Sequence, residues 1–156
     1  MAGKVRPIPE GYRSVTPYLV VKGAGKAIDF YKTVFGAREK FRMDGPDGRI
    51  AHAEIEIGDS VVMLADENPQ HGALSPATVG GTPVSIMLYV EDVDRVAERL
   101  TKAGAKTLRA VQDMFYGDRS GGFEDPFGHV WHVSTHVEDV TPEEIERRIK
   151  AMAQKR

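Results

Sequence analysis

Cysteine is absent from this 156-residue sequence. Its absence excludes disulfides, thiolate nucleophiles, zinc ribbons and iron–sulfur clusters, so any metal site must use His, Asp, Glu or neutral oxygen ligands. An excess of charge of one sign is missing too, because 21 Lys and Arg stand against 23 Asp and Glu, a formal net charge of -2. We therefore expect no nucleic-acid partner.

Long apolar runs are also missing. No segment reaches the roughly 18 apolar residues of a membrane-spanning helix, and the opening stretch MAGKVRPIPEGYRSV has no signal-peptide core. The sequence thus predicts no membrane partner and a cytoplasmic location. Apolar residues still make up 41% of the chain and charged residues 28%, which is typical of a folded globular domain.

The first half of the sequence predicts one strand, one helix and three further strands. Apolar residues recur at helical spacing before the stop signal Gly36, and the turn-forming segment DGPDG separates two extended runs. The expected elements are a strand in the run VTPYLVV after Ser14, a helix over 24–35, and strands over 39–43, 50–57 and 60–65.

The same pattern returns after a segment rich in proline and glycine. Asp92 is the expected N-cap of the second helix, and Gly104 ends it. Thr141, Pro142 and Glu144 form a capping-box pattern, which predicts a helix that serves packing or dimerisation. The expected strands lie over 84–90, 107–112, 116–124 and 129–135.

These patterns predict an α+β fold built from tandem β-α-β-β-β modules. The predicted organisation is a single domain over 1–156, with modules over 14–66 and 84–136, a linker over 67–83 and a C-terminal helix over 141–154.

Three motifs in this order and spacing resemble the vicinal oxygen chelate superfamily, which includes glyoxalase I, extradiol dioxygenases and bleomycin-resistance proteins. The motifs are AIDFYKTVFGA, PDGRIAHAEIEIGDSVVMLADE and YGDRSGGFEDPFGHVWHVSTHVEDVTPEE, and they are most similar to the PhnB-type branch. The resemblance covers Ser14 to about Glu144. It implies U-shaped mixed sheets, the glyoxalase/bleomycin-resistance fold, with helices on the convex side, a ligand on the concave side, and a homodimer.

Strand alternation assigns the two faces of these sheets. Over 50–57 the apolar residues must meet the helix, so His52, Glu54 and Glu56 face the hollow or solvent. The other residues expected to point inward are Thr16, Tyr18, Met63, Ser85, Met87, Tyr89 and His132. Those expected to meet the helices are Leu19, Val21, Leu64, Ile86, Leu88, Val90, Trp131 and Val133.

Metal-dependent members of the superfamily carry four ligands, usually His, Gln or Glu, on the first and last strands of each half. The positions that the resemblance implies here are Thr16, Met63, Ser85 and His132. Because only His132 is a competent ligand, we expect no metal and no other cofactor. A divalent metal held by His52, Glu54 and His132 is the alternative, against the simpler interpretation that His52 and Glu54 form the wet face of a strand.

Inward aromatic and thioether side chains are typical of an adaptable small-molecule site. The expected ligand-binding residues are Tyr18, His52, Glu54, Met63, Met87, Tyr89, Arg119 and His132. No catalytic residue is assigned. Arg119 either clamps a carboxylate or phosphate or pairs with Asp118 or Glu124, while His129 and His136 are interpreted as hydrogen-bonded turn residues.

Two main hypotheses follow. The first is a metal-free protein of the bleomycin-resistance kind, which sequesters an aromatic, partly cationic small molecule in a homodimer groove with carboxylates such as Glu54 and Asp66. The second is an enzyme: a metal-assisted lyase, isomerase or dioxygenase of the superfamily, or a metal-free enzyme with His132 as general base. A plain interaction module is a third interpretation.

Overall fold

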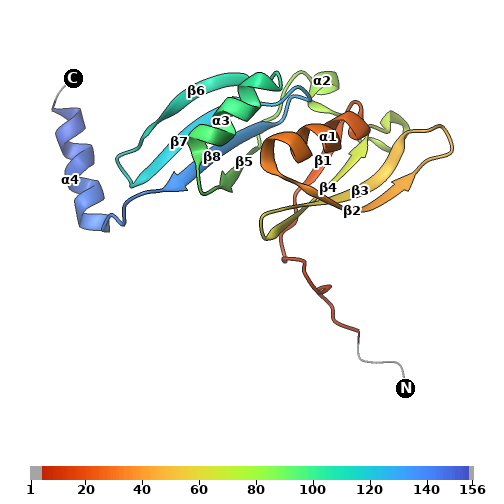
Figure 1. Cartoon of the computed structure of the whole chain (residues 1–156), viewed down its shortest axis with the longest axis horizontal. Helices are drawn as coiled ribbons and strands as arrows, with labels where there is room; N and C mark the ends of the chain where they lie inside the picture. Colours follow the sequence, from red (N-terminus) through yellow and green to blue (C-terminus); the bar gives the residue numbers. More distant parts are fainter. Residues whose placement is uncertain (1–4, 155–156) are drawn as a thin grey trace. The chain divides into compact units, whose positions relative to one another are not determined.

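A computed structural model of the chain describes residues 5–154. The first residues of the opening stretch, 1–4, and the end of the basic tail, 155–156, lie outside the described residues. The chain forms two compact units that divide between Thr82 and Pro83, each with its own sheet (Figure 1). The single domain over 1–156 and its linker stay predictions.

The first unit contains a four-stranded mixed sheet in the order β1-β4-β3-β2, with α1 packed against one face (Figure 1). Strand β1 runs parallel to β4, and the other pairs are antiparallel. The elements are β1 Tyr18–Val21, α1 Ala24–Phe35, β2 Arg38–Asp44, β3 Ile50–Ile57 and β4 Ser60–Asp66.

Helix α1 has the bounds that its apolar spacing predicts. It buries Ala27, Ile28 and Tyr31 against the sheet, and Gly36 in the left-handed region (φ 67°) ends it. At its start, Oδ1 of Asp66 accepts the backbone N–H groups of Gly23 and Ala24, both at 2.8 Å. The end of β4 therefore caps the helix that precedes it in sequence.

The segment after β4 contains two short helices that the sequence analysis did not predict: η1 Pro69–His71 and α2 Pro76–Val79. They are too short for helical periodicity, and each starts with a proline. The Glu67 carboxylate accepts hydrogen bonds from the Ser75 backbone N–H and the Thr78 hydroxyl, which lower its pKa to about 2. This ionised carboxylate fixes the start of α2.

The second unit repeats the same strand order, β5-β8-β7-β6, with α3 packed on one face (Figure 1). The elements are β5 Ser85–Tyr89, α3 Val93–Lys102, β6 Lys106–Asp113, β7 Asp118–Glu124 and β8 Val130–His136. Two mixed sheets with helices confirm the predicted α+β fold. Strand β7 starts later than the expected 116, because a turn closed by the Gly117 N–H to Met114 O bond precedes it.

Trp131 lies in the core of the second unit, as strand alternation predicts, with 1% of its surface exposed. Its indole N–H donates to Oδ2 of the buried Asp125 at 2.9 Å. The other oxygen of Asp125 accepts the backbone N–H groups of Phe127 and His129. One carboxylate thus ties the β7–β8 turn to the core.

Helix α4, Pro142–Ala153, follows β8 beyond the sheet of the second unit (Figure 1). The Thr141 hydroxyl accepts the Glu144 backbone N–H at 3.3 Å, so the predicted N-cap is confirmed. The Glu144 carboxylate does not complete the capping box; it accepts hydrogen bonds from Arg147 and Arg148 instead. Over residues 5–154, no helix combines the length and apolar character that a membrane span requires.

Candidate functional site

Each sheet has one face that packs against a helix and an opposite face, which we call the open face. In the first unit the helix-facing Leu19, Ala53 and Leu64 are buried, whereas their neighbours Tyr18 and Glu54 are not. Of the other residues expected to point inward, His52, Glu56 and Met63 are half-buried on the open face. Thr16 precedes β1, and its hydroxyl donates to the Arg13 carbonyl at 3.3 Å. Strand alternation therefore assigned the two faces correctly.

The open face of the first unit carries a continuous chain of hydrogen bonds. The Tyr18 hydroxyl lies 2.8 Å from His52 Nδ1, and His52 Nε2 lies 3.2 Å from Glu54 Oε1. The Tyr12 hydroxyl donates to the other oxygen of Glu54. Because a carboxylate only accepts, His52 donates through Nε2; in a neutral imidazole, Nδ1 then accepts from Tyr18. The chain therefore converges on Glu54.

The electrostatics of this chain favour an ionised Glu54 and protonated tyrosines. Partial burial raises the pKa of Glu54, but the hydrogen bonds from Tyr12 and His52 outweigh burial and lower the pKa overall. The hydrogen bond to Glu54 raises the pKa of Tyr12, and partial burial together with the Glu54 charge raises the pKa of Tyr18. No Lys or Arg of the unit's described residues forms an ion pair with Glu54.

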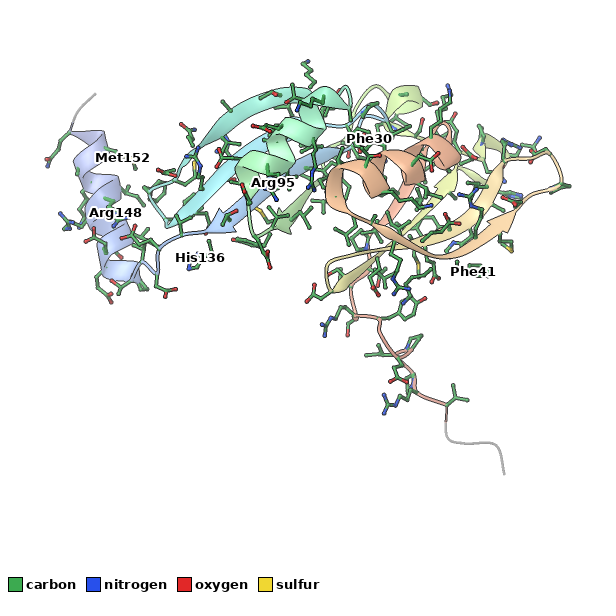
Figure 2. All side chains as sticks on the ribbon, viewed as in Figure 1. Phe30, Phe41, Arg95, His136, Arg148 and Met152 are labelled. Carbon is green, nitrogen blue, oxygen red and sulfur yellow. The ribbon has the colours of Figure 1, made fainter. Side chains whose placement is uncertain are left out.

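Apolar side chains flank this chain on strand β2. Phe41 and Met43 lie opposite Glu54 and His52 in the β2–β3 register, and each is 50% exposed. The Phe41 and His52 ring centroids are 6.2 Å apart, and Figure 2 shows Phe41 at the edge of the sheet. Sequence reasoning missed Tyr12, Phe41 and Met43; the register of the predicted hairpin was the signal that could have placed Phe41 and Met43.

The open face of the second unit carries a different group, centred on Asp118 at the start of β7. Asp118 is 4% exposed; it accepts the Tyr89 hydroxyl at 2.8 Å and His136 Nδ1 at 2.8 Å. His136 Nε2 also donates to Asp139 at 2.9 Å. The hydrogen bonds to Asp118 and then Asp139 raise the pKa of His136. The expectation of a hydrogen-bonded His136 is confirmed.

Further along the same face, the buried Ser120 and Ser134 bond to each other, and Ser120 accepts hydrogen bonds from Arg109. The Ser134 hydroxyl lies 2.8 Å from the Ser120 hydroxyl and 3.4 Å from the Met87 sulfur. Arg109 on β6 donates to the Ser120 hydroxyl at 3.0 Å and to the Ser120 carbonyl at 3.2 Å. The polar chain thus crosses the sheet from β5 to β6. Sequence reasoning missed Arg109, Ser120 and Ser134.

His132 lies on this open face next to Gly122, its register partner on β7. A Cβ atom placed on Gly122 would lie 3.3 Å from His132 Nδ1 and 3.6 Å from Arg109 Cβ. Glycine at this position therefore lets the His132 and Arg109 side chains approach from both sides. Met87 and Tyr89 are 49% and 58% exposed, and Ser85 is exposed on the same face.

Arg119 does not share this face. Its guanidinium donates to Asp94 on α3 at 2.7 and 2.8 Å, and to Asp113 at 3.0 Å. The structure therefore gives Arg119 carboxylate partners, but Asp94 and Asp113 rather than the expected Asp118 or Glu124. The side chain of Asp118 points to the opposite face because adjacent strand residues alternate.

The residues at the metal positions of the fold do not fit a divalent transition ion. Thr16 and Ser85 offer hydroxyls, Met63 offers a thioether, and only His132 offers an imidazole. Such an ion takes three or more imidazole, carboxylate or thiolate ligands. Between residues 5 and 154, no group of three or more His, Asp or Glu is arranged to hold a metal. His52 and Glu54 bond to each other and to tyrosines instead.

A hollow of about 670 Å³ lies apart from the open face, at the start of α1. Its lining includes cations that already have acidic partners, such as Arg42 with Glu39 and Arg49 with Asp47. Asp66, an expected ligand carboxylate, also lines it, but both of its oxygens accept backbone N–H groups. Asp66 therefore has a structural role.

The repeated β-α-β-β-β topology, with polar and aromatic residues on the open faces, defines a fold of two similar modules. The chain belongs to the Glyoxalase/Bleomycin resistance protein/Dioxygenase superfamily, whose sequence model matches residues 13–133. The expectation from the sequence motifs is thereby confirmed.

Relatives in sequence include the uncharacterized protein Rv0887c of Mycobacterium tuberculosis, which is 43% identical over 136 residues, 85% of this chain and 80% of that protein. The lactoylglutathione lyase of Neisseria meningitidis serogroup A is 29% identical over 105 residues, 67% of this chain and 76% of that protein.

Solved structures agree on the fold. TioX from Micromonospora sp. ML1 is 27% identical with a TM-score of 0.62, over 80% of this chain and 99% of that chain. The PhnB protein from Bacillus cereus is similar in fold at 16% identity and a TM-score of 0.61, over 79% of this chain and 99% of that chain.

Proposed function

We propose that this protein is a metal-free, cytoplasmic, homodimeric small-molecule binding protein that sequesters an aromatic or cationic ligand on its open faces. The observation that carries the proposal is the hydrogen-bonded chain of Tyr18, His52 and Glu54 on the open face of the first unit. The proposed ligand-binding residues are Tyr18, His52, Glu54, Met63, Met87, Tyr89 and His132.

The polarity of the hydrogen-bonded chain formed by Tyr18, His52 and Glu54 supports a ligand that donates hydrogen bonds or carries positive charge. With His52 neutral, the Tyr18 hydroxyl hydrogen points to Nδ1, so the Tyr18 oxygen presents lone pairs outward. Glu54 keeps a negative charge; its hydrogen-bond partners are His52 and Tyr12, and the nearby charge of Lys40 also lowers its pKa. An aromatic cation would add ring contacts with Tyr18 and Phe41, both 50% exposed.

The donor set supports binding without a metal. A lyase, isomerase or dioxygenase of the metal-assisted kind would need more ligands than His132 supplies at the family positions. The similarity to a lactoylglutathione lyase is therefore the argument for the alternative, and metal content is the measurement that separates the two hypotheses.

The test is isothermal titration with benzyltrimethylammonium, an aromatic cation. We expect Tyr18→Ala and Tyr89→Ala each to weaken binding more than tenfold, about 1.4 kcal/mol. Tyr18→Phe keeps the ring and separates stacking from hydrogen bonding, and Val79→Ala on exposed α2 serves as the control. Unchanged affinity in both alanine variants would refute the assigned faces.

Elemental analysis of protein purified without chelator tests the absence of a metal. We expect no stoichiometric ion, and titration in EDTA should give the same affinity. A tightly held ion at one per chain would overturn the metal-free proposal and favour the enzyme. Sedimentation equilibrium tests the homodimer, for which we expect twice the chain mass.

A further inference from the structure

We propose that the open face of the second unit binds the anionic group of a small organic molecule, a carboxylate or a phosphonate, through Arg109 and His132. The inference deepens the proposed function by assigning a ligand chemistry to this face. It does not depend on the residues of the first unit.

The partners of Arg109 differ from those of other arginines in the second unit. Its guanidinium contacts the Ser120 hydroxyl, the Ser120 carbonyl and the Met114 sulfur, all of which are neutral. Other arginines of this unit, Arg119 and Arg148, instead bond to two carboxylates each. No Asp or Glu among the described residues of the second unit lies within ion-pair distance of Arg109.

Two N–H donors of the Arg109 guanidinium stay available to a ligand. A guanidinium has five N–H groups in a planar fork, and the three contacts of Arg109 leave two of them for a ligand. The contacts to both oxygens of Ser120 fix the plane of the guanidinium. A planar, fixed pair of donors matches the two oxygens of a carboxylate or phosphonate.

The positive charge of Arg109 has no negative partner in the described part of the second unit, and such a charge is costly to bury. Arg109 is half-buried, and a guanidinium cannot release its proton to escape that cost. The hydroxyl and carbonyl of Ser120 provide partial charges only. A bound oxyanion would supply the missing negative charge.

His132 adds a second donor on the same side. It lies across Gly122 from Arg109, and neither ring nitrogen has a hydrogen-bond partner within the described part of the second unit. The exposed side chains of Met87 and Tyr89 lie on neighbouring β5 and give the organic body of the ligand an apolar surface. The open face of the second unit therefore combines donors for an anionic group with an apolar surface for the rest of the ligand.

The test measures affinities for phenylphosphonate, benzoate and neutral benzamide at constant ionic strength, by NMR titration of the full-length protein. We expect at least one of the two anions to bind at least tenfold more tightly than benzamide and to shift the Arg109 Nε–H signal. Arg109→Gln should weaken that anion at least tenfold, whereas Arg95→Gln on α3 should change nothing.

The wild-type Nε–H signal keeps the proposal testable even if Arg109→Gln does not fold. Equal affinity for benzamide and both anions, or anion binding that leaves this signal unmoved, would overturn the proposal. Benzyltrimethylammonium separates the two proposals: if it binds in a Tyr18-dependent way and the anions do not bind, only the anion site fails. If the anions bind and benzyltrimethylammonium does not, the anion site of the second unit stands and the cation proposal for the first unit fails.

Discussion

The buried Asp118 and the exposed His136 form an ion pair at one end of the second sheet. Nδ1 of His136 lies 2.8 Å from the Asp118 carboxylate. Asp118 lies at the start of β7 and His136 at the end of β8, where Figure 2 shows it. The same carboxylate holds the Tyr89 hydroxyl. The pair therefore orients a tyrosine of the proposed ligand face.

This pair makes stability depend on pH. Asp118 and Asp139 raise the pKa of His136 above its ordinary 6.5, so the protonated form is favoured in the folded state. The resulting stabilisation is fully present below the unfolded pKa and disappears as pH rises through the folded pKa. We therefore expect His136→Gln to lose more unfolding free energy at pH 5.5 than at pH 9, measured by urea denaturation.

The exposed His71 on η1 provides the control for that measurement. His71→Gln is the matched substitution, and the change between the two pH values should be larger for His136→Gln than for His71→Gln. A wild-type minus His136→Gln difference that does not change between pH 5.5 and pH 9 would contradict the assigned ion pair.

Gly117 should resist substitution. Its φ is 99°, and a Cβ atom there would lie 2.1 Å from the Glu138 carbonyl oxygen. The Val137 and Glu138 N–H groups both bond to the Gly117 carbonyl, so this close approach fixes the end of β8. We expect Gly117→Ala to lower the free energy of unfolding by about 2 kcal/mol or more, measured by chemical denaturation.

Gly58 is the matched control, because it also has a positive φ (59°) but no atom within 4 Å of an added Cβ. Gly58→Ala should cost only about 1 kcal/mol, the conformational part of the penalty. Equal costs in the two variants would show that the contact with Glu138 is unimportant.

The Trp131–Asp125 bond should contribute to the stability of the second unit. Trp131→Phe leaves one oxygen of buried Asp125 without its indole donor, which typically costs about 1 to 3 kcal/mol. A double-mutant cycle with Asp125→Ala measures the coupling by urea denaturation. We expect a coupling of about 1 kcal/mol; additive effects would mean that the packing of the ring alone matters.

Arg148 should hold α4 in place. Arg148, labelled on α4 in Figure 2, bonds to the Phe115 carbonyl and to Glu138, outside the helix. No residue of α4 is buried. We expect Arg148→Ala to speed amide exchange within 142–153 at least tenfold, measured by hydrogen–deuterium exchange. Within residues 5–154, the neighbouring Arg147 bonds only to Glu144 of the same helix, so Arg147→Ala should have a much smaller effect.

The sequence predicted the backbone of this protein better than its side-chain contacts. Period-two alternation placed His52 on an open face and Trp131 on a helix-packed face, and helical spacing gave the bounds of α1. Both signals lie within a few neighbouring residues of the sequence. The pairing of Arg119 with Asp94 joins residues 25 apart and depends on how α3 lies on the sheet. No local pattern contains that distance.

The same limit explains the site residues that sequence reasoning missed. Arg109 meets Ser120 through an irregular β6–β7 register, with shifts on both sides of Arg109 that alternation does not foresee. Tyr12 precedes the first strand and reaches Glu54 across 42 residues. Short helices such as α2 leave no periodic signal at all.

The repeated strand order has a consequence for how this molecule can diversify. Strands β3 and β8 place core residues such as Ile55 and Trp131 on the helix-packed face and residues such as Glu54 and His132 on the open face, so neighbouring positions serve separate purposes. The open face of the first unit presents the Glu54 carboxylate, and that of the second presents the Arg109 guanidinium. Substitutions at the open-face positions therefore change the chemistry of one unit while its helix-packed core stays intact.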